Sequence, residues 1–163
     1  MLDPSSFPWE TQTVKSSHLY REINMASEDT IPQNDLDPDC AFCKAFEESR
    51  VVESLGSVVA IKDRYPVSEG HFLILPKRHT LDYFTMTEWE RRDTEKLLLK
   101  LRNQIASEDK SVTGFNIGVN CGESAGQTIW HAHTHLIPRR DGDTPNPRGG
   151  VRGVIPDKMD YGD

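Results

Sequence analysis

The chain has 163 residues, enough for one domain with an extension, and its formal net charge is -7. Residues 1–38 hold seven acidic and two basic residues, so they contribute -5 of that charge and leave the remainder close to neutral. This balance argues against a broad surface for nucleic acid or for an anionic membrane, but it permits a small anion-binding pocket.

No stretch reaches the roughly 20 apolar residues of a membrane-spanning helix, and no basic and apolar signal region opens the chain. The cysteines are Cys40, Cys43 and Cys121, and an odd number suits a reducing compartment better than a disulfide framework. We therefore expect a soluble, cytoplasmic protein with neither a membrane nor a nucleic acid among its partners.

Residues 1–38 are polar, contain few apolar side chains that could dock, and are interrupted by Pro4, Pro8, Pro32 and Pro38. Such a composition buries too little apolar surface to order itself. We predict an acidic N-terminal extension that is partly ordered at best and behaves as a solvated arm.

The pattern changes at Cys40 and predicts a short helix followed by three strands: the helix at 41–49 and strands at 51–55, 57–62 and 71–76. Gly56 separates the first two strands, and residues 66–70 form a turn before the third. Pro76 ends that short buried strand because proline donates no hydrogen bond to a sheet.

A long helix follows. Thr87 and Glu90 have the spacing of a capping box, which marks a helix start. The apolar residues behind it recur at helical spacing up to about Ser107: Trp89, Leu97, Leu98, Leu101 and Ile105. We interpret these leucines as core residues.

The last predicted elements are strands at 115–119 and 129–137, joined through a loop at 122–126. The helices and strands are segregated along the chain, so the fold class is α+β with a mostly antiparallel sheet of five strands, one short helix and one long helix.

The final strand contains three alternating histidines, His131, His133 and His135. In an extended segment, alternate side chains share one face at intervals of about 6.6 Å, so the pattern predicts three imidazoles that face one space. Imidazole has an ordinary pKa of roughly 6.5 and serves near neutral pH as nucleophile, acid, base or metal ligand. The alternative is a half-buried strand with polar residues on its outer face.

Cys40 and Cys43 form a Cys-x-x-Cys pair. Together with His79 they suit a tetrahedral zinc site that needs one more ligand. A redox pair is the rival hypothesis, although no thioredoxin-like βαβ pattern flanks it, and free buried thiols are the third possibility. Cys121 has no partner in the sequence and is interpreted as an incidental loop thiol.

These residues together resemble the histidine triad (HIT) superfamily. Residues 131–137 resemble its histidine motif, with Thr134 more polar than usual, while residues 63–79 resemble its nucleoside-binding strand and turn and residues 120–128 resemble its phosphate loop. The resemblance implies a HIT-like fold for a domain at 39–142, followed by a tail at 143–163. Gln127, Thr128 and residues 138–143 are most similar to zinc-containing bacterial and fragile-histidine-triad-like dinucleoside polyphosphate hydrolases.

The resemblance implies that His133 attacks the α-phosphorus of a nucleotide and forms a nucleotidyl-histidine intermediate, which water then cleaves. It also implies catalytic roles for His135 and Gln127 at the phosphate. A neutral nucleophile and clustered hydrogen-bond donors meet the chemical need, because the phosphorus is shielded by negative oxygens.

The positions that resemble the family's substrate-binding residues are Asp63, His71, Asn120, Gly126, Gln127, Thr128 and His135. Asp63 matches the position that holds the ribose hydroxyls, a suitable task for a carboxylate acceptor. Asp63, Asn120 and Gly126 are equally typical of turns, and His71 is equally typical of a structural histidine.

For the metal, the resemblance implies that His131 completes the zinc site of Cys40, Cys43 and His79. A closed site with four ligands is structural and offers no open position, so no catalytic cofactor is expected. The resemblance also implies a homodimer and an adenine nucleotide as substrate.

The arginines at 139, 140, 148 and 152 outnumber Asp141 and Asp143 and give the tail a local charge of about +2, which attracts polyphosphate, although a flexible solvated end is equally typical. The leading hypothesis is a nucleotide hydrolase. The alternatives are a phosphoramidase, a dinucleoside polyphosphate phosphorylase, and a nucleotide-binding regulatory module in which turnover is incidental.

Overall fold

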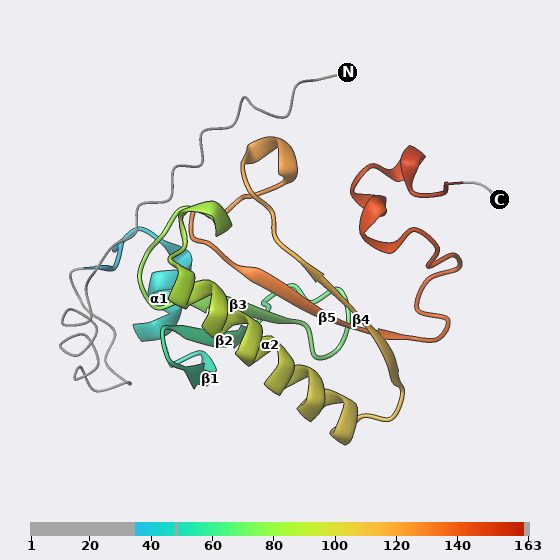
Figure 1. Ribbon diagram of the computed structural model, residues 1–163, viewed down its shortest axis with the longest axis horizontal. Helices are drawn as coiled ribbons and strands as arrows, with labels where there is room; N and C mark the ends of the chain where they lie inside the picture. Colours follow the sequence, from blue (N-terminus) through green and yellow to red (C-terminus); the bar gives the residue numbers. More distant parts are fainter. Residues whose placement is uncertain (1–34, 48, 162–163) are drawn as a thin grey trace, which may run out of the picture. The chain divides into compact units, whose positions relative to one another are not determined.

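The computed structural model describes residues 35–47 and 49–161 (Figure 1). The predicted extension lies outside the described residues apart from residues 35–38, so its behaviour stays a prediction. Within the described ranges, no helix is long and apolar enough to cross a membrane.

The helices and strands, in chain order, are α1 (Ala41–Glu47), β1 (Val51–Leu55), β2 (Val58–Lys62), β3 (Phe72–Pro76), α2 (Glu88–Glu108), β4 (Val112–Gly118) and β5 (Thr134–Arg140). Short 3-10 turns lie at η3 (Tyr83–Thr85), η4 (Glu123–Ala125), η5 (Gly150–Val154) and η6 (Pro156–Lys158). The last two belong to the tail. The α+β class with one short and one long helix is confirmed.

The five strands form one sheet in the order β1-β2-β3-β5-β4, and every neighbouring pair is antiparallel. β5 therefore lies inside the sheet between β3 and β4, although the chain reaches it last. The strand that carries His135 is paired on both edges by backbone hydrogen bonds, which suits a site that needs fixed geometry.

Alternate residues of β2 serve two hydrophobic cores. Val59 and Ile61 pack in the cluster that includes α1, whereas Val58 and Ala60 pack in the cluster that includes α2. This division follows from the period of two in a strand. The two helices therefore cover opposite faces of the sheet, and α2 runs the length of its face (Figure 1).

The helix ends have local causes. Thr87 caps α2 as predicted: its hydroxyl accepts the Glu90 N–H at 3.2 Å, and the Glu90 carboxylate accepts the Thr87 N–H at 2.7 Å. The predicted helix at 41–49 ends at Glu47, because Ser49 adopts a left-handed φ of 55° that does not continue a helix.

The predicted strand at 129–137 is wrong in its extent, since β5 begins only at Thr134 and continues to Arg140. β3 pairs with β5 only as far as Thr134. Upstream of that residue the chain bonds elsewhere: the Ala132 N–H donates to the Thr80 carbonyl at 2.7 Å. His131 and His133 therefore precede the strand, and strand alternation does not set their directions.

Gly56, in the turn between β1 and β2, has a φ of +54°, and a Cβ there would meet the Asp93 carboxylate. We expect Gly56→Ala to lower the free energy of unfolding by more than about 1 kcal/mol, because the left-handed conformation alone costs an L-residue about 1–2 kcal/mol. Gly114→Ala is the matched control, because the nearest atom to its Cβ lies 3.7 Å away in ordinary contact. Urea denaturation of the two variants checks this; equal losses would contradict it.

Candidate active site and metal centre

His133 is buried, with 8% of its surface exposed. Its Nδ1 lies 2.8 Å from the carbonyl oxygen of His131. A carbonyl only accepts hydrogen bonds, so Nδ1 carries the hydrogen and the Nε2 lone pair is available. Burial lowers the pKa of His133, which the His131 carbonyl partly opposes. The ring is therefore a neutral base with a defined free nitrogen.

His135 lies on the α1 face of the sheet, since it stands opposite Leu73 of the α1 cluster. Its Nδ1 is 3.0 Å from Nε2 of His71, and its ring centroid is 5.1 Å from that of His133. Burial lowers the pKa of His135 to about 4, and the neighbouring His133 and His71 add to the effect. Among the described residues, its buried Nε2 has no hydrogen-bond partner. A buried nitrogen without a partner is suited to bind a ligand atom.

Asp63 follows β2 and faces His71, with Oδ2 at 3.4 Å from His71 Nδ1. Its other oxygen accepts the Tyr65 N–H at 2.8 Å, so the turn interpretation also holds for this residue. The Val67 N–H lies 3.4 Å from the same Nδ1. Burial lowers the pKa of His71, and the Asp63 carboxylate opposes this shift. Asp63, His71 and His135 thus form one cluster, with ligand atoms within 4.8 Å of one another.

The loop between β4 and β5 holds the other predicted phosphate-binding residues. Asn120 is half-buried shortly after β4, Thr128 is exposed, and Gly126 has a φ of 83°. Gln127 is buried instead: its Oε1 accepts the Gly122 N–H at 2.8 Å, while its Nε2 donates to Leu81 O at 2.7 Å. In this structure its amide shapes the loop, and a role for Gln127 at the phosphate stays a prediction.

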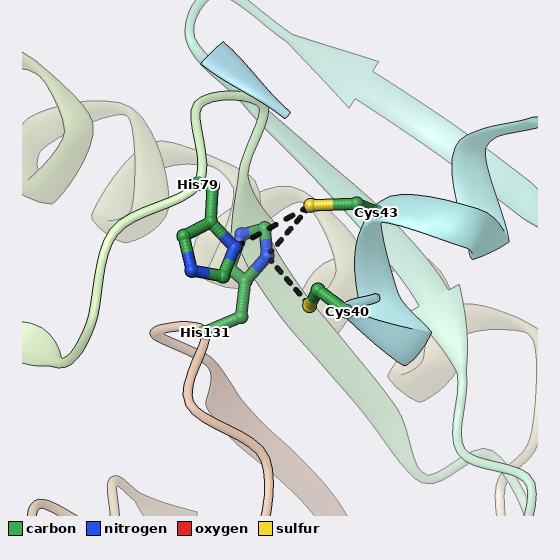
Figure 2. A group of neighbouring side chains, drawn as sticks. All are labelled: Cys40, Cys43, His79 and His131. Carbon is green, nitrogen blue, oxygen red and sulfur yellow. Dashed lines mark hydrogen bonds between the residues drawn. The ribbon is translucent and has the colours of Figure 1, made fainter. Parts of the chain in front are cut away.

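The second cluster contains Cys40, Cys43, His79 and His131, whose ligand atoms all lie within 4.8 Å of one another. Figure 2 shows the two sulfurs, that of Cys43 in α1 and that of Cys40 just before it, pointing toward the two rings. His131 Nδ1 is 3.6 Å from each sulfur, and His79 Nδ1 is 3.5 Å from that of Cys43. These distances match the edge of about 3.5 Å expected for a tetrahedron with Zn–S of about 2.3 Å and Zn–N of about 2.0 Å.

The surroundings of His131 agree with a metal ligand. Its Nε2 donates to the carbonyl oxygen of Pro76 at 3.0 Å, which leaves the Nδ1 lone pair facing the sulfurs. The side chain is fully buried, and burial lowers its pKa to about 4, so the ring is neutral. Imidazole binds metals in this neutral form.

The thiols lack the environment that a redox pair needs. Among the described residues, all three cysteines are free, and burial raises the pKa of Cys43 to about 11. Redox-active cysteines need a lowered pKa, because the thiolate is the reactive form. The environment therefore favours metal binding over disulfide chemistry.

Sequence reasoning missed the contacts around both clusters. The Phe42 ring lies edge-on to His133, with centroids 5.0 Å apart, and its place inside the Cys-x-x-Cys pair was the available signal. The Asp37 N–H lies 3.5 Å from the Cys43 sulfur, and the Asp37 carboxylate lies 3.8 Å from His79 Nε2. The sequence gives no signal for the Asp37 contacts.

The fold and the site together indicate the class of protein: the sheet carries neutral histidines on one face, beside a cluster of two cysteines and two histidines. The HIT domain family model matches residues 45–142, so the chain belongs to this family. The relative named adenylylsulfatase HINT3 from Arabidopsis thaliana is 34% identical over 119 residues, which cover 69% of this chain and 58% of that protein.

Solved structures agree. A HIT family protein from Bacillus anthracis has 35% identity and a TM-score of 0.61, covering 66% of this chain and 78% of the other. A histidine triad family protein from Mycobacterium smegmatis, solved with zinc bound, has 27% identity and a TM-score of 0.61, covering 66% and 80%. The expected HIT fold is therefore confirmed.

The lowered pKa of His135 makes stability depend on pH. The unfolded chain takes up a proton near the ordinary value of 6.5, whereas folded His135 does so at about 4. The stability that its neutral form provides is therefore present above about pH 6.5 and is lost as the pH falls toward 4. We expect the free energy of unfolding to fall more steeply in this window for the wild type than for His135→Asn. Urea denaturation at several pH values measures both slopes, and equal slopes would contradict the expectation.

Proposed function

We propose that this protein is a nucleotide hydrolase or transferase that cleaves at the α-phosphate of dinucleoside polyphosphates or related adenylated molecules, with His133 as nucleophile. The observation that carries the proposal is the 2.8 Å hydrogen bond from His133 Nδ1 to the carbonyl of His131. It leaves Nε2 as the nucleophilic atom on a neutral ring. Membership of the HIT family supports the choice of a nucleotide substrate.

The reaction has two steps. The Nε2 lone pair of His133 forms a bond to the α-phosphorus while the bond to the leaving oxygen breaks, and the leaving group departs with that electron pair. Water then attacks the nucleotidyl-histidine and gives up a proton, the P–N bond breaks, and nucleoside monophosphate is released. His133 returns to its neutral form.

The neighbouring groups fit the needs of this reaction. If His71 Nδ1 accepts the Val67 N–H, then Nε2 of His71 donates to Nδ1 of His135, and Nε2 of His135 carries a hydrogen for a phosphate oxygen. Asp63 is proposed to accept the ribose hydroxyls. The loop residues Asn120, Gly126, Gln127 and Thr128 are proposed to border the phosphates.

The residues at the second cluster fit a structural zinc ion, which Cys40, Cys43, His79 and His131 would hold. Two thiols and two neutral imidazoles at tetrahedral spacing are the donor set that zinc prefers. When bound, the ion cross-links the start of α1 to the triad segment and adds folding free energy. The zinc-bound neighbour from Mycobacterium smegmatis supports this proposal.

Several substrates compete within the same chemistry. A phosphoramidase would expel an amine, and a phosphorylase would use phosphate in place of water. The name of the Arabidopsis relative adds adenylyl sulfate to the candidates. Incubation with diadenosine tetraphosphate, an adenylated amine and adenylyl sulfate, each with and without phosphate, followed by product identification, separates these activities. Tight binding of adenosine monophosphate without turnover of any of them would favour the regulatory module instead.

A homodimer is also proposed. β4 is the last strand of the sheet, and Leu99 of α2 and Ile117 of β4 are about half exposed. A two-fold axis that joins two β4 edges would cover such side chains. Light scattering on the full chain measures the mass, and a monomer at micromolar concentration would contradict the proposal.

We expect His133→Ala to lower turnover by at least about 10³-fold, because it removes the nucleophile. Rapid acid-free quenching of the wild type should trap a protein with the added mass of a nucleoside monophosphate, and the variant should show none. Circular dichroism and zinc content serve as controls for folding. Substantial turnover by a folded variant would refute the assignment of His133.

We expect Cys40→Ser to lower the zinc content and to reduce the Tm by roughly 10 °C, because structural zinc contributes directly to folding. Cys121→Ser is the matched control, since Cys121 is a half-buried loop thiol outside the cluster. Metal analysis and thermal denaturation of protein prepared without chelators measure both effects. Wild-type protein that contains no zinc and gains no stability from it would eliminate the site.

A further inference from the structure

We propose that the ion pair between Arg78 and Glu90 is a positioning element for the metal centre. It ties the segment that carries His79 to the first turn of α2 and so keeps both histidine ligands in place. This inference rests on the zinc site proposed above. Neither residue belongs to the clusters described so far.

The pair is stronger than helix capping requires. Arg78 Nε lies 3.0 Å from Glu90 Oε1 and Nη2 lies 2.8 Å from Oε2, so both carboxylate oxygens are engaged. The Glu90 side chain is only 5% exposed. The capping box itself uses only Oε2 of Glu90, which accepts the Thr87 N–H. Burying a carboxylate is costly unless it is fully paired, so this fork-shaped contact fixes Arg78 firmly.

Arg78 lies in the middle of residues 76–81, whose backbone carbonyls accept hydrogen bonds from the triad region and the loop before it. The Pro76 carbonyl accepts from His131 Nε2 at 3.0 Å, and the Thr80 carbonyl accepts the Ala132 N–H at 2.7 Å. The Leu81 carbonyl accepts from Gln127 Nε2 at 2.7 Å. A displacement of Arg78 would therefore move these carbonyls and the triad region with them.

His79 depends most on this anchor. Its side chain is 26% exposed, whereas the other three members of the cluster are buried, with Cys40 at 8% and His131 at 0%. Packing therefore restrains His79 least, and hydrogen bonds must hold its segment: the His79 N–H donates to Asp35 O at 2.7 Å, and the Asp37 carboxylate lies 3.8 Å from His79 Nε2. Arg78 adds a restraint from the α2 side, since besides pairing with Glu90 it donates to Thr85 O at 3.4 Å.

The test variant is Arg78→Met combined with Glu90→Gln. The double change removes the pair without leaving a buried charge, and the glutamine oxygen still accepts the Thr87 N–H. We expect the zinc affinity of the purified full chain, measured by chelator competition, to fall by about 10- to 100-fold, the usual effect of losing a group that orients a metal ligand. Arg78→Lys keeps the charge but only one contact, so its zinc affinity should lie between those of the wild type and the double variant.

Asp93→Asn is the matched control. Asp93 also lies on α2, and its carboxylate accepts the Ser57 N–H and hydroxyl at 2.9 Å each, but it serves the β1–β2 turn. It should lose stability while keeping wild-type zinc affinity. Unchanged affinity in Arg78→Lys and in the folded double variant, or an equal loss in Asp93→Asn, would overturn the proposal and leave the zinc site standing. Absence of zinc binding in the wild type would overturn both.

Discussion

The hydrogen bond from His133 Nδ1 to the carbonyl of His131 is the contact on which the site depends. His131 belongs to the cysteine cluster through its ring and to the proposed nucleophile through its backbone. Its own ring is fixed by the Pro76 carbonyl, at the end of β3. The end of β3 therefore holds the ring of the candidate metal ligand His131, and the backbone of His131 in turn holds the proposed nucleophile His133.

The long helix supports this arrangement from the opposite face of the sheet. Near its first turn, Glu90 holds Arg78 beside the cysteine cluster. Just past its end, Asp109 holds Arg140 at 2.6 Å, and Arg140 also donates to Ser68 in the turn before His71. Hydrogen bonds from Ser111 and Arg140 lower the pKa of Asp109 to about 2. The two ends of α2 thus restrain the two sides of the site.

Much of this was predictable from the sequence because the signals are local. The capping box at Thr87 and the apolar periodicity fixed α2 to within a residue or two, and the Cys-x-x-Cys pair pointed to a cluster that the structure assembles. The start of β5 was not predictable from local signals. It depends on where pairing between β3 and β5 begins, and on the hydrogen bond from Ala132 to Thr80, which is distant in the sequence. The Arg78–Glu90 pair is hidden in the same way: a partly buried ion pair looks like two surface charges when only the sequence is known.

The late start of β5, at Thr134, has a chemical consequence. A regular strand would point all three imidazoles to one side, where they would share one task. Because residues 131–133 are irregular, the bonded nitrogen differs from ring to ring: Nε2 in His131, but Nδ1 in His133 and in His135. The available nitrogen is therefore Nδ1 in the first ring, facing the sulfurs, and Nε2 in the other two. One short motif can thus offer a lone pair to the proposed metal from its first histidine and a lone pair to the proposed phosphorus from its second, while the third presents an N–H, because the partner of one ring nitrogen decides what the other nitrogen can do.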